Sequence, residues 1–215
     1  MTRRRLPHIY PENRWLFLTW HLHGSLPHSH FPPARKVCGG EAFAWIDRYV
    51  DAARLGPTYL RQKEITTMVV ESLFRGESLG HYQLGPWVVM ANHVHMLVLP
   101  NIEANQLLKS LKGATAREAN RLLGRTGEQF WQRETYDHSV RDEKEWSRIA
   151  RYIEGNPVKA GLVERAEDYT WSSANPRFRP GVHMSVNAAR TSACATNTSA
   201  GSTSTSACAA SRILA

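Results

Sequence analysis

The stretch that most restricts the fold is WVVMANHVHMLVLP, residues 87–100, which is apolar almost throughout. Successive side chains of a strand point to opposite faces of the sheet, so residues 93–99 form a strand that is largely apolar on both faces. Such a strand lies centrally in a sheet that is covered on both sides. Ala91 and Asn92 interrupt the run, and Asn suits the backbone angles of a tight turn. The stretch therefore predicts a β-hairpin whose second strand is central.

Two histidines, His93 and His95, share one face at the start of this strand. Two neighbouring imidazoles are half of a metal site, but a bare His-x-His is more typical of buried polar groups that have found hydrogen-bond partners. His21 and His23 show the same spacing at the end of another predicted strand. The spacing alone does not choose between these pairs.

The remaining pattern alternates helices with antiparallel strands and indicates an α+β fold, one sheet with helices packed on it. The Gly85-Pro86 pair in the first hairpin strand suggests a bulge. Periodicity and end signals predict two further strands, over residues 14–24 and 81–90, and an extended or irregular segment over 129–140. They also predict four helices, over residues 40–55, 63–76, 103–124 and 142–155, the third with an interruption at Gly113.

The last predicted helix has clear end signals. Asp142 suits the N-cap with Glu145 three residues later, and Gly155 and Pro157 predict the end of the helix. Tyr152 borders the apolar stripe, and the residue four positions later, Asn156, lies on the same side. Taken by themselves, these two residues are more typical of a half-buried aromatic and a C-cap.

Composition narrows the class of protein. The formal net charge of +8 favours a polyanionic partner such as nucleic acid. Three scattered cysteines match neither a disulfide framework nor a zinc motif. With no signal peptide and no apolar run of about 20 residues, we expect a cytoplasmic protein that does not enter a membrane.

Four segments in this order resemble the REP-associated tyrosine transposases, bacterial relatives of the single-tyrosine HUH transposases: VVMANHVHMLVLP, FWQRETYDHSVRDEKEW, RYIEGNPVKAGLV and YTWSSA. The resemblance implies a ferredoxin-like antiparallel sheet, His93 and His95 as a metal-binding pair, Tyr152 as the nucleophile and Asn156 as a third ligand. His21 and His23 match no catalytic position. Ala91 stands where the family usually has Pro.

The family resemblance further implies cleavage and rejoining of single-stranded DNA at palindromic hairpins, through a covalent 5′-phosphotyrosine and with Mg²⁺ or Mn²⁺ as cofactor. Tyr136 is the alternative nucleophile. The sequence leaves open whether the chain acts as a monomer or a homodimer. The residues that we expect to follow the phosphate backbone are basic: Lys109, Lys112, Arg117, Arg121, Arg133, Arg148 and Arg151.

Two other functions fit parts of the pattern. The first is a nucleic-acid-binding module of ferredoxin-like fold without catalysis, which would tolerate Phe at position 152. The second is a metallohydrolase, but one large class continues His-x-His with Asp and His, whereas His95 is followed by MLVLP.

A change of composition divides the chain into a catalytic domain over residues 1–178 and a disordered Ser/Thr/Ala-rich tail over 179–215. Because the tail lacks large apolar residues, we expect deletion from about residue 180 to leave both DNA cleavage and the melting temperature unchanged. Calorimetry and a cleavage assay on the shortened chain measure this. A cooperative loss of thermal stability would contradict the prediction.

Overall fold

The computed structural model describes residues 13–25 and 56–181. The helix predicted over residues 40–55, and all but the start of the predicted tail, lie outside the described residues. The elements in chain order are β1 (Leu16–His21), the 3-10 helix η2 (Tyr59–Arg61), α2 (Lys63–Ser78), β2 (Tyr82–Val89), β3 (His93–Pro100), α3 (Ala104–Leu122), β4 (Tyr136–Ser139), α4 (Glu143–Lys159) and the 3-10 helices η3 (Ala166–Asp168) and η4 (Pro176–Gly181).

The four strands form one antiparallel sheet in the order β2-β3-β1-β4. The hairpin strand β3 is central, as its two apolar faces predict. Its neighbours are β2, joined to it by the turn at Ala91 and Asn92, and β1 from the start of the described chain. The α+β prediction with a ferredoxin-like antiparallel sheet is confirmed.

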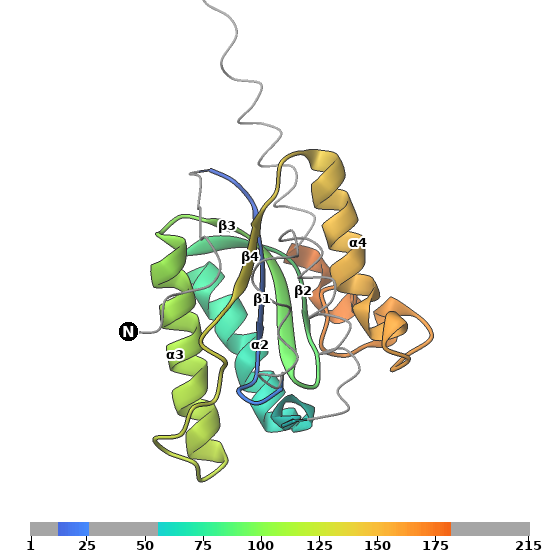
Figure 1. Cartoon of the computed structure of the whole chain (residues 1–215). Coiled ribbons are helices and arrows are strands. Elements are labelled where there is room, and N and C mark those ends of the chain that lie inside the picture. The colour runs from blue at the N-terminus through green and yellow to red at the C-terminus, as the bar shows by residue number, and fades with distance from the viewer. Residues whose placement is uncertain (1–12, 26–55, 182–215) are drawn as a thin grey trace, which may run out of the picture.

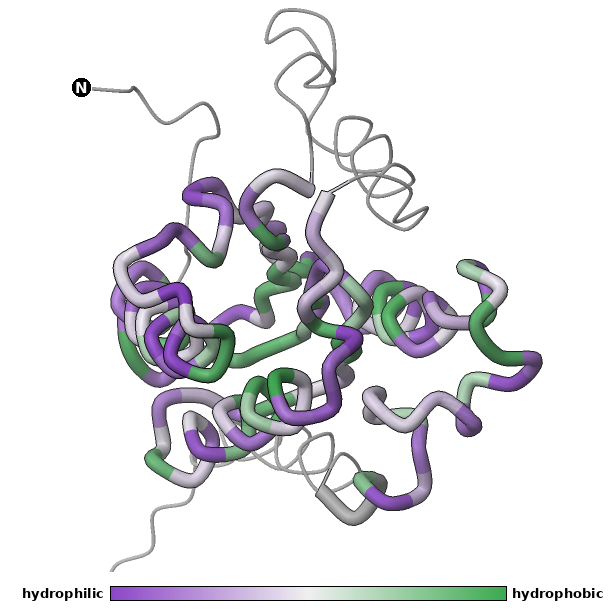
Figure 2. Tube along the Cα trace, turned by 90° about the horizontal axis from the view of Figure 1, so that it is seen from below, coloured by the Kyte–Doolittle hydropathy of each residue, from purple (hydrophilic) through white to green (hydrophobic). Residues whose placement is uncertain are grey.

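Helices cover the two faces of the sheet unequally (Figure 1). On one face, α2 and α3 pack against Leu18, Met96 and Trp87 in the larger apolar core. On the other face, α4 packs through Ile149 and Ile153 in a smaller core. Figure 2 shows the apolar segments gathered between the helices, whose outer turns are hydrophilic. The smaller core leaves room on its face for polar groups of the sheet.

Strand β2 contains the predicted irregularity. The pairing of β2 with β3 shifts register between Leu84 and Trp87, where Gly85 and Pro86 lie. A Cβ on Gly85 would come within 2.9 Å of the Trp15 ring and 3.1 Å of the Leu97 carbonyl oxygen, so only glycine fits. The bulge sets which side chains of the following residues face α4.

The outer edge of β2 pairs with a segment that follows α4. The Ser173 backbone N–H donates to the Trp87 carbonyl at 2.9 Å, and Val89 donates to the Trp171 carbonyl at 2.9 Å. The Ser173 hydroxyl also donates to Glu154 of α4 at 3.0 Å. This segment satisfies the strand edge and ties α4 to the sheet.

Two helix predictions are wrong in detail. Gly113 does not interrupt α3, which continues from Ala104 to Leu122. Helix α4 does not end at Gly155 and Pro157 but runs to Lys159, with Pro157 in its last turn. The Asn156 carbonyl accepts the Ala160 N–H at 2.9 Å, and Gly161 then ends the helix with a positive φ of 69°. A proline so close to the end of a helix removes only one backbone donor.

The start of α4 is fixed by Glu145, which is 5% exposed. The Asp142 side chain accepts the Glu145 N–H at 2.7 Å, as the predicted N-cap requires. The Glu145 carboxylate accepts from the guanidinium groups of Arg141, at 2.8 Å, and Arg148, at 3.0 Å. His138 of β4 lies 3.2 Å away. Hydrogen bonds from Arg141 lower the pKa of Glu145 to about 2.

No helix within residues 13–25 and 56–181 has the length and apolar character that crossing a membrane requires.

Replacing Glu145 with Gln is therefore expected to lower the free energy of unfolding at pH 7 by about 1.5–3 kcal/mol. The carboxylate stabilises the fold fully above its ordinary pKa of 4.5, and this contribution is lost as pH falls towards 2. The difference between wild type and Glu145→Gln should thus shrink across that window. Urea unfolding at several pH values measures it. Glu143→Gln, in the same turn but exposed, is the control, and an equal effect there would refute the interpretation.

Candidate active site

The two histidines of β3 lie on the face of the sheet that α4 covers. His95 is paired across the sheet with Thr19 of β1 and with Val88 of β2, and His93 is paired with His21. Both imidazoles are buried, with exposed fractions of 0% for His95 and 1% for His93. Their ring centroids are 4.6 Å apart.

The Nδ1 atom of each imidazole is held by a neighbouring polar side chain. His93 Nδ1 donates to the Asn92 Oδ1 atom at 2.8 Å. His95 Nδ1 lies 2.7 Å from the Thr19 hydroxyl oxygen. A neutral imidazole with its proton on Nδ1 has its lone pair on Nε2. The His93 ring is therefore set to act as an acceptor or ligand through Nε2, and the Thr19 hydroxyl orients the His95 ring.

The fourth turn of α4 brings a third polar group to these rings. The Asn156 amide nitrogen lies 3.3 Å from His95 Nε2, in the geometry of a donor to that lone pair. Asn156 is completely buried, and its Oδ1 atom accepts no hydrogen bond from the described residues. Burying an amide oxygen without a hydrogen-bond donor costs free energy. This position therefore suits a bound group that contacts the Asn156 Oδ1 atom.

These donors fit a divalent cation. When the Asn156 amide turns its oxygen instead of its nitrogen towards His95, two Nε2 lone pairs and an amide oxygen are available, a set that suits ions such as Mn²⁺ and Mg²⁺. Outer partners on both Nδ1 atoms are the usual arrangement of histidine ligands. Across the residues that the structure describes, no three His, Cys, Asp and Glu side chains are grouped to hold a metal. The candidate site thus depends on the amide of Asn156 as well as on the two imidazoles.

Tyr152 lies one turn before Asn156 on the same side of α4. Its ring centroid is 5.7 Å from that of His95 and 6.1 Å from that of Phe17. The Lys159 Nζ atom is 5.3 Å from the centre of the tyrosine ring. The hydroxyl oxygen is shielded from solvent, whereas the side chain as a whole is half-buried. One helix thus brings a phenol and an amide to one imidazole.

The alternative nucleophile, Tyr136, lies on β4 on the same sheet face, 6.1 Å from Phe17. Burial, with Asp137 and Glu145 nearby, raises the pKa of Tyr136 to about 12. Its phenolate is therefore harder to form than that of an ordinary tyrosine.

The two histidines of the second pair, His21 and His23, have different surroundings in the structure. His21 lies beside His93, and burial lowers its pKa to about 4, so it is neutral at pH 7. His23 is exposed, and its Nδ1 lies 3.0 Å from Gln132 Oε1. Only His21 therefore adjoins the candidate site.

The basic residues expected to bind DNA have different surroundings. The Lys112 ammonium donates to the carbonyls of Gln132 and Arg133, at 2.8 and 3.2 Å, and to Thr135. Lys112 is thus a structural link between α3 and the segment before β4. This placement does not suit the prediction that Lys112 follows a phosphate backbone.

The other six predicted residues are exposed, but two of them form ion pairs with neighbouring carboxylates. Arg121 pairs with Glu118 at 2.6 Å, and Arg148 pairs with Glu145 at 3.0 Å. The remaining exposed cations on α3, on α4 and before β4 are Lys109, Arg117, Arg133 and Arg151.

Three residues at the site have positions that the sequence did not indicate. Thr19 is the one hydroxyl in the strand LFLTWH, a signal that could have been noticed, and Asn92 was assigned only to the turn. Lys159 reaches Tyr152 because α4 extends beyond its predicted end.

Comparison with known proteins shows which family the chain resembles. Residues 60–156 match the model of a family described as Transposase IS200 like. A Haemophilus influenzae protein assigned to the REP-associated tyrosine transposases is 31% identical over 98 residues, covering 40% of this chain and 54% of its own. The REP-associated tyrosine transposase of Escherichia coli is 27% identical over 103 residues, covering 47% and 60%.

A solved structure of a REP-associated tyrosine transposase bound to a REP hairpin has the same fold, with a TM-score of 0.53 and 19% identity. It covers 85% of this chain and 88% of that chain. The resemblance inferred from the sequence is confirmed: the matching family model and both relatives are transposases. Within that class the chain is similar to the REP-associated tyrosine transposases, although it spans between half and two thirds of the two relatives' lengths.

The contact between Thr19 and His95 gives a test of the metal site. We expect Thr19→Val to weaken Mn²⁺ binding about 10- to 100-fold, because the hydroxyl that holds His95 through Nδ1 is lost. Thr19→Ser keeps the hydroxyl and should bind nearly as the wild type does, whereas His93→Ala and His95→Ala should not bind. Calorimetry measures affinity, and ¹⁵N chemical shifts report the His95 tautomer. Equal affinity in the Val and Ser variants would exclude this role for Thr19.

Proposed function

We propose that the chain cleaves and rejoins single-stranded DNA through a covalent 5′-phosphotyrosine on Tyr152. A divalent cation, Mg²⁺ or Mn²⁺, is held by His93, His95 and Asn156. The observation that supports this most is that α4 brings Tyr152 and Asn156 against the same imidazole, His95. The similarity to tyrosine transposases supports the same reaction class.

In the reaction, the Tyr152 oxygen attacks a phosphorus atom of the DNA backbone. The phenol loses its proton to solvent as the new P–O bond forms, and the bond from phosphorus to the 3′ oxygen breaks. That oxygen leaves with the electron pair and takes up a proton. Because one phosphodiester replaces another, the reverse attack by a 3′-hydroxyl rejoins the strand without ATP.

The residues around Tyr152 make this attack easier. A phenol with an ordinary pKa near 10 is mostly neutral at pH 7. The ammonium group of Lys159 over the ring favours the phenolate. When bound, a divalent cation polarises the phosphate and neutralises charge that develops on it. Since the Tyr152 hydroxyl is shielded from solvent, the tyrosine side chain must turn outward to meet a phosphate.

We propose palindromic hairpins as the substrate. The related solved structure holds a REP hairpin, and the charge of +8 here suits a phosphate backbone. Residues 1–178 act as the catalytic domain in this proposal.

Tyr152→Phe removes one oxygen and should abolish the covalent adduct, lowering cleavage at least 10³-fold, while leaving DNA and metal binding unchanged. The assay incubates the full chain with labelled single-stranded hairpin DNA and Mn²⁺, and mass spectrometry of peptides locates the adduct. Tyr136→Phe is the control and should keep the adduct. Full cleavage by Tyr152→Phe, or a nucleotide attached to Tyr136, would overturn the assignment. Binding without any adduct in the wild type would favour a non-catalytic DNA-binding module.

A further inference from the structure

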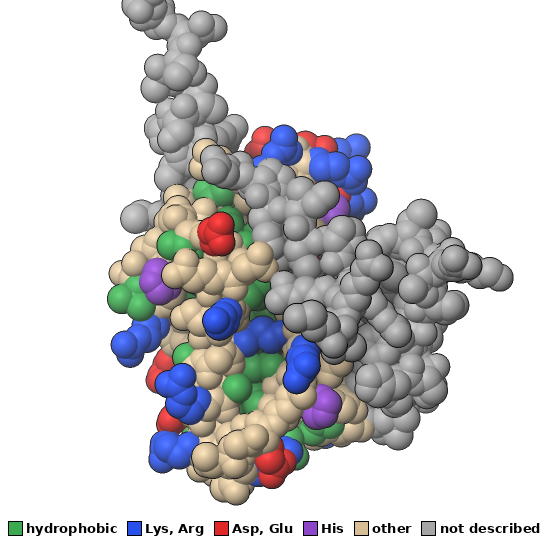
Figure 3. Space-filling model, turned by 60° about the vertical axis from the view of Figure 1, so that its left-hand side comes forward, with side chains coloured by type: hydrophobic (Ala, Val, Ile, Leu, Met, Phe, Trp, Pro, Cys, Tyr) green, Lys and Arg blue, Asp and Glu red, His purple; other side chains and the backbone are tan. Residues whose placement is uncertain are grey.

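A groove of about 600 Å³ runs along α3, away from the face that α4 covers. One wall is the part of α3 around Lys109 and Gly113, and the other is the segment over residues 128–135. Figure 3 shows this side of the molecule, with Lys and Arg side chains around a hollow whose floor is apolar. Small-molecule pockets have volumes of roughly 300–1,000 Å³, so the groove has room for one nucleotide.

The groove contains a glycine, Gly113, that the packing of the described residues does not require. Gly113 lies in the middle of α3, where glycine is unfavourable relative to alanine. A Cβ added to Gly113 would meet nothing within 4 Å. Packing within the described chain therefore does not require glycine at this position. The open space at Gly113 leaves the helix backbone accessible to a ligand that approaches closely.

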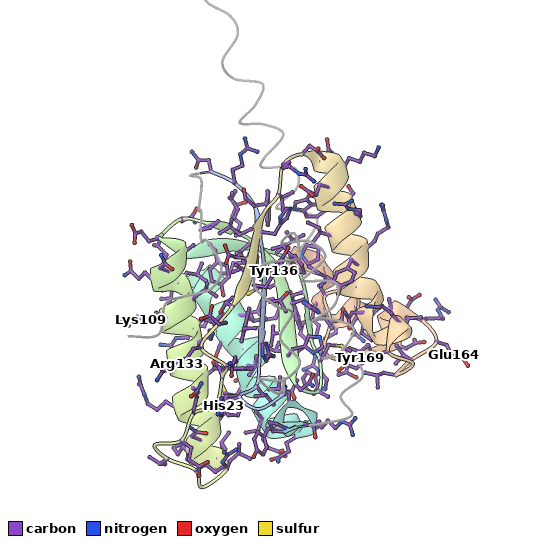
Figure 4. All side chains as sticks on the ribbon, in the orientation of Figure 1. His23, Lys109, Arg133, Tyr136, Glu164 and Tyr169 are labelled. Carbon is purple, nitrogen blue, oxygen red and sulfur yellow. The ribbon has the colours of Figure 1, made fainter. Side chains whose placement is uncertain are left out.

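The polar groups of the groove suit a nucleotide. Lys109 and Arg133 are exposed and form no ion pair within the described parts of the chain, so both are available to a phosphate. Figure 4 shows Lys109 on α3 and Arg133 on the segment beside it. Glu134 also lines the groove, and its Oε2 atom is buried without a hydrogen-bond partner among the described residues. That oxygen requires an N–H donor, and the carboxylate must turn outward into the groove to meet one on a ligand.

The acceptor favours one base over the others. Guanine has two adjacent donors on its Watson–Crick edge, the N1–H and the 2-amino group, and both can bind one carboxylate. Adenine and cytosine place an acceptor nitrogen beside a single amino group. Thymine has one N–H between two carbonyl oxygens, which repel a carboxylate. A base within a duplex has its Watson–Crick edge occupied, so the nucleotide must be unpaired.

We propose that this groove binds one unpaired guanine nucleotide of the DNA, with its base at Glu134, its sugar over Gly113 and its phosphate at Lys109 and Arg133. This inference rests on the proposed action on single-stranded DNA. The wall of the groove leads directly into β4, whose first residue, Tyr136, pairs with Thr19, the partner of His95. A guanine held here would place the neighbouring part of the strand beside the candidate active site.

The test measures binding of labelled pentanucleotides TTGTT, TTATT, TTCTT and TTTTT to the full chain by fluorescence anisotropy in EDTA, so that no cleavage occurs. We expect TTGTT to bind about tenfold more tightly than TTTTT. Glu134→Gln should remove this preference, whereas Glu164→Gln, an equal change of charge outside the groove, should keep it.

Gly113→Ala should weaken TTGTT binding about tenfold while raising the melting temperature, because alanine favours the helix but fills the groove. Gly155→Ala is its match, since a Cβ there also meets nothing within 4 Å, and it should keep the guanine preference.

Equal binding of all four oligonucleotides by the wild type, or an unchanged preference in Gly113→Ala, would overturn the groove proposal alone. A retained guanine preference without any adduct on Tyr152 would overturn only the proposed catalysis.

Discussion

The chemistry available on this face of the sheet depends on the hydrogen-bond partners of the Nδ1 atoms of His93 and His95. His93 is held by the Asn92 side chain and His95 by the Thr19 hydroxyl, and the Asn156 amide donates to His95 Nε2, so that both Nε2 atoms are acceptors inside a buried core. Without those partners, each ring could exchange tautomers, and a buried pair of imidazoles would have no fixed chemistry. The pairing of β1 with β3 is what brings Thr19 to His95. The site therefore depends on a register between strands that are 76 residues apart along the chain.

Helix α4 contributes the remaining groups of the site because its ends are fixed independently of the site. At its start, Glu145 connects the helix to β4 through His138, and after its end the pairing of Ser173 with β2 closes the structure around it. The position of the helix on the sheet is therefore fixed, and Tyr152 and Asn156 lie against His95. The groove along α3 is anchored in a similar way, since Lys112 connects its two walls. In each candidate site, one charged side chain connects structural elements, Glu145 at α4 and Lys112 at the groove. Other side chains of the site remain available to a ligand.

Much of the fold followed from local patterns. The two-sided apolar strand predicted the central position of β3, and the Gly85-Pro86 pair predicted the bulge. The Asp142 cap was also correct. The end of α4 was predicted wrongly, because Pro157 was taken as a stop, although a proline in the last turn removes only one hydrogen bond. The shared face of the histidines followed from strand periodicity. Their contacts with Thr19 and Asn156 could not, because each depends on tertiary pairing that no local pattern encodes.

The bulge at Gly85 and Pro86 has a consequence for which lengths of β2 are compatible with the site. Ahead of it, even-numbered residues such as Leu84 face α2 and α3; beyond it, odd-numbered residues such as Trp87 do. Leu84 pairs with Val98 and Trp87 with Met96, so the two residues of the bulge lie opposite the single residue Leu97. Removing one of the two would abolish the bulge and let β2 alternate regularly, with Leu84 and Trp87 still on the same face. Removing Val88 instead would keep the bulge and place Val89 opposite His95, so a single-residue deletion harms the site more beyond the bulge than within it.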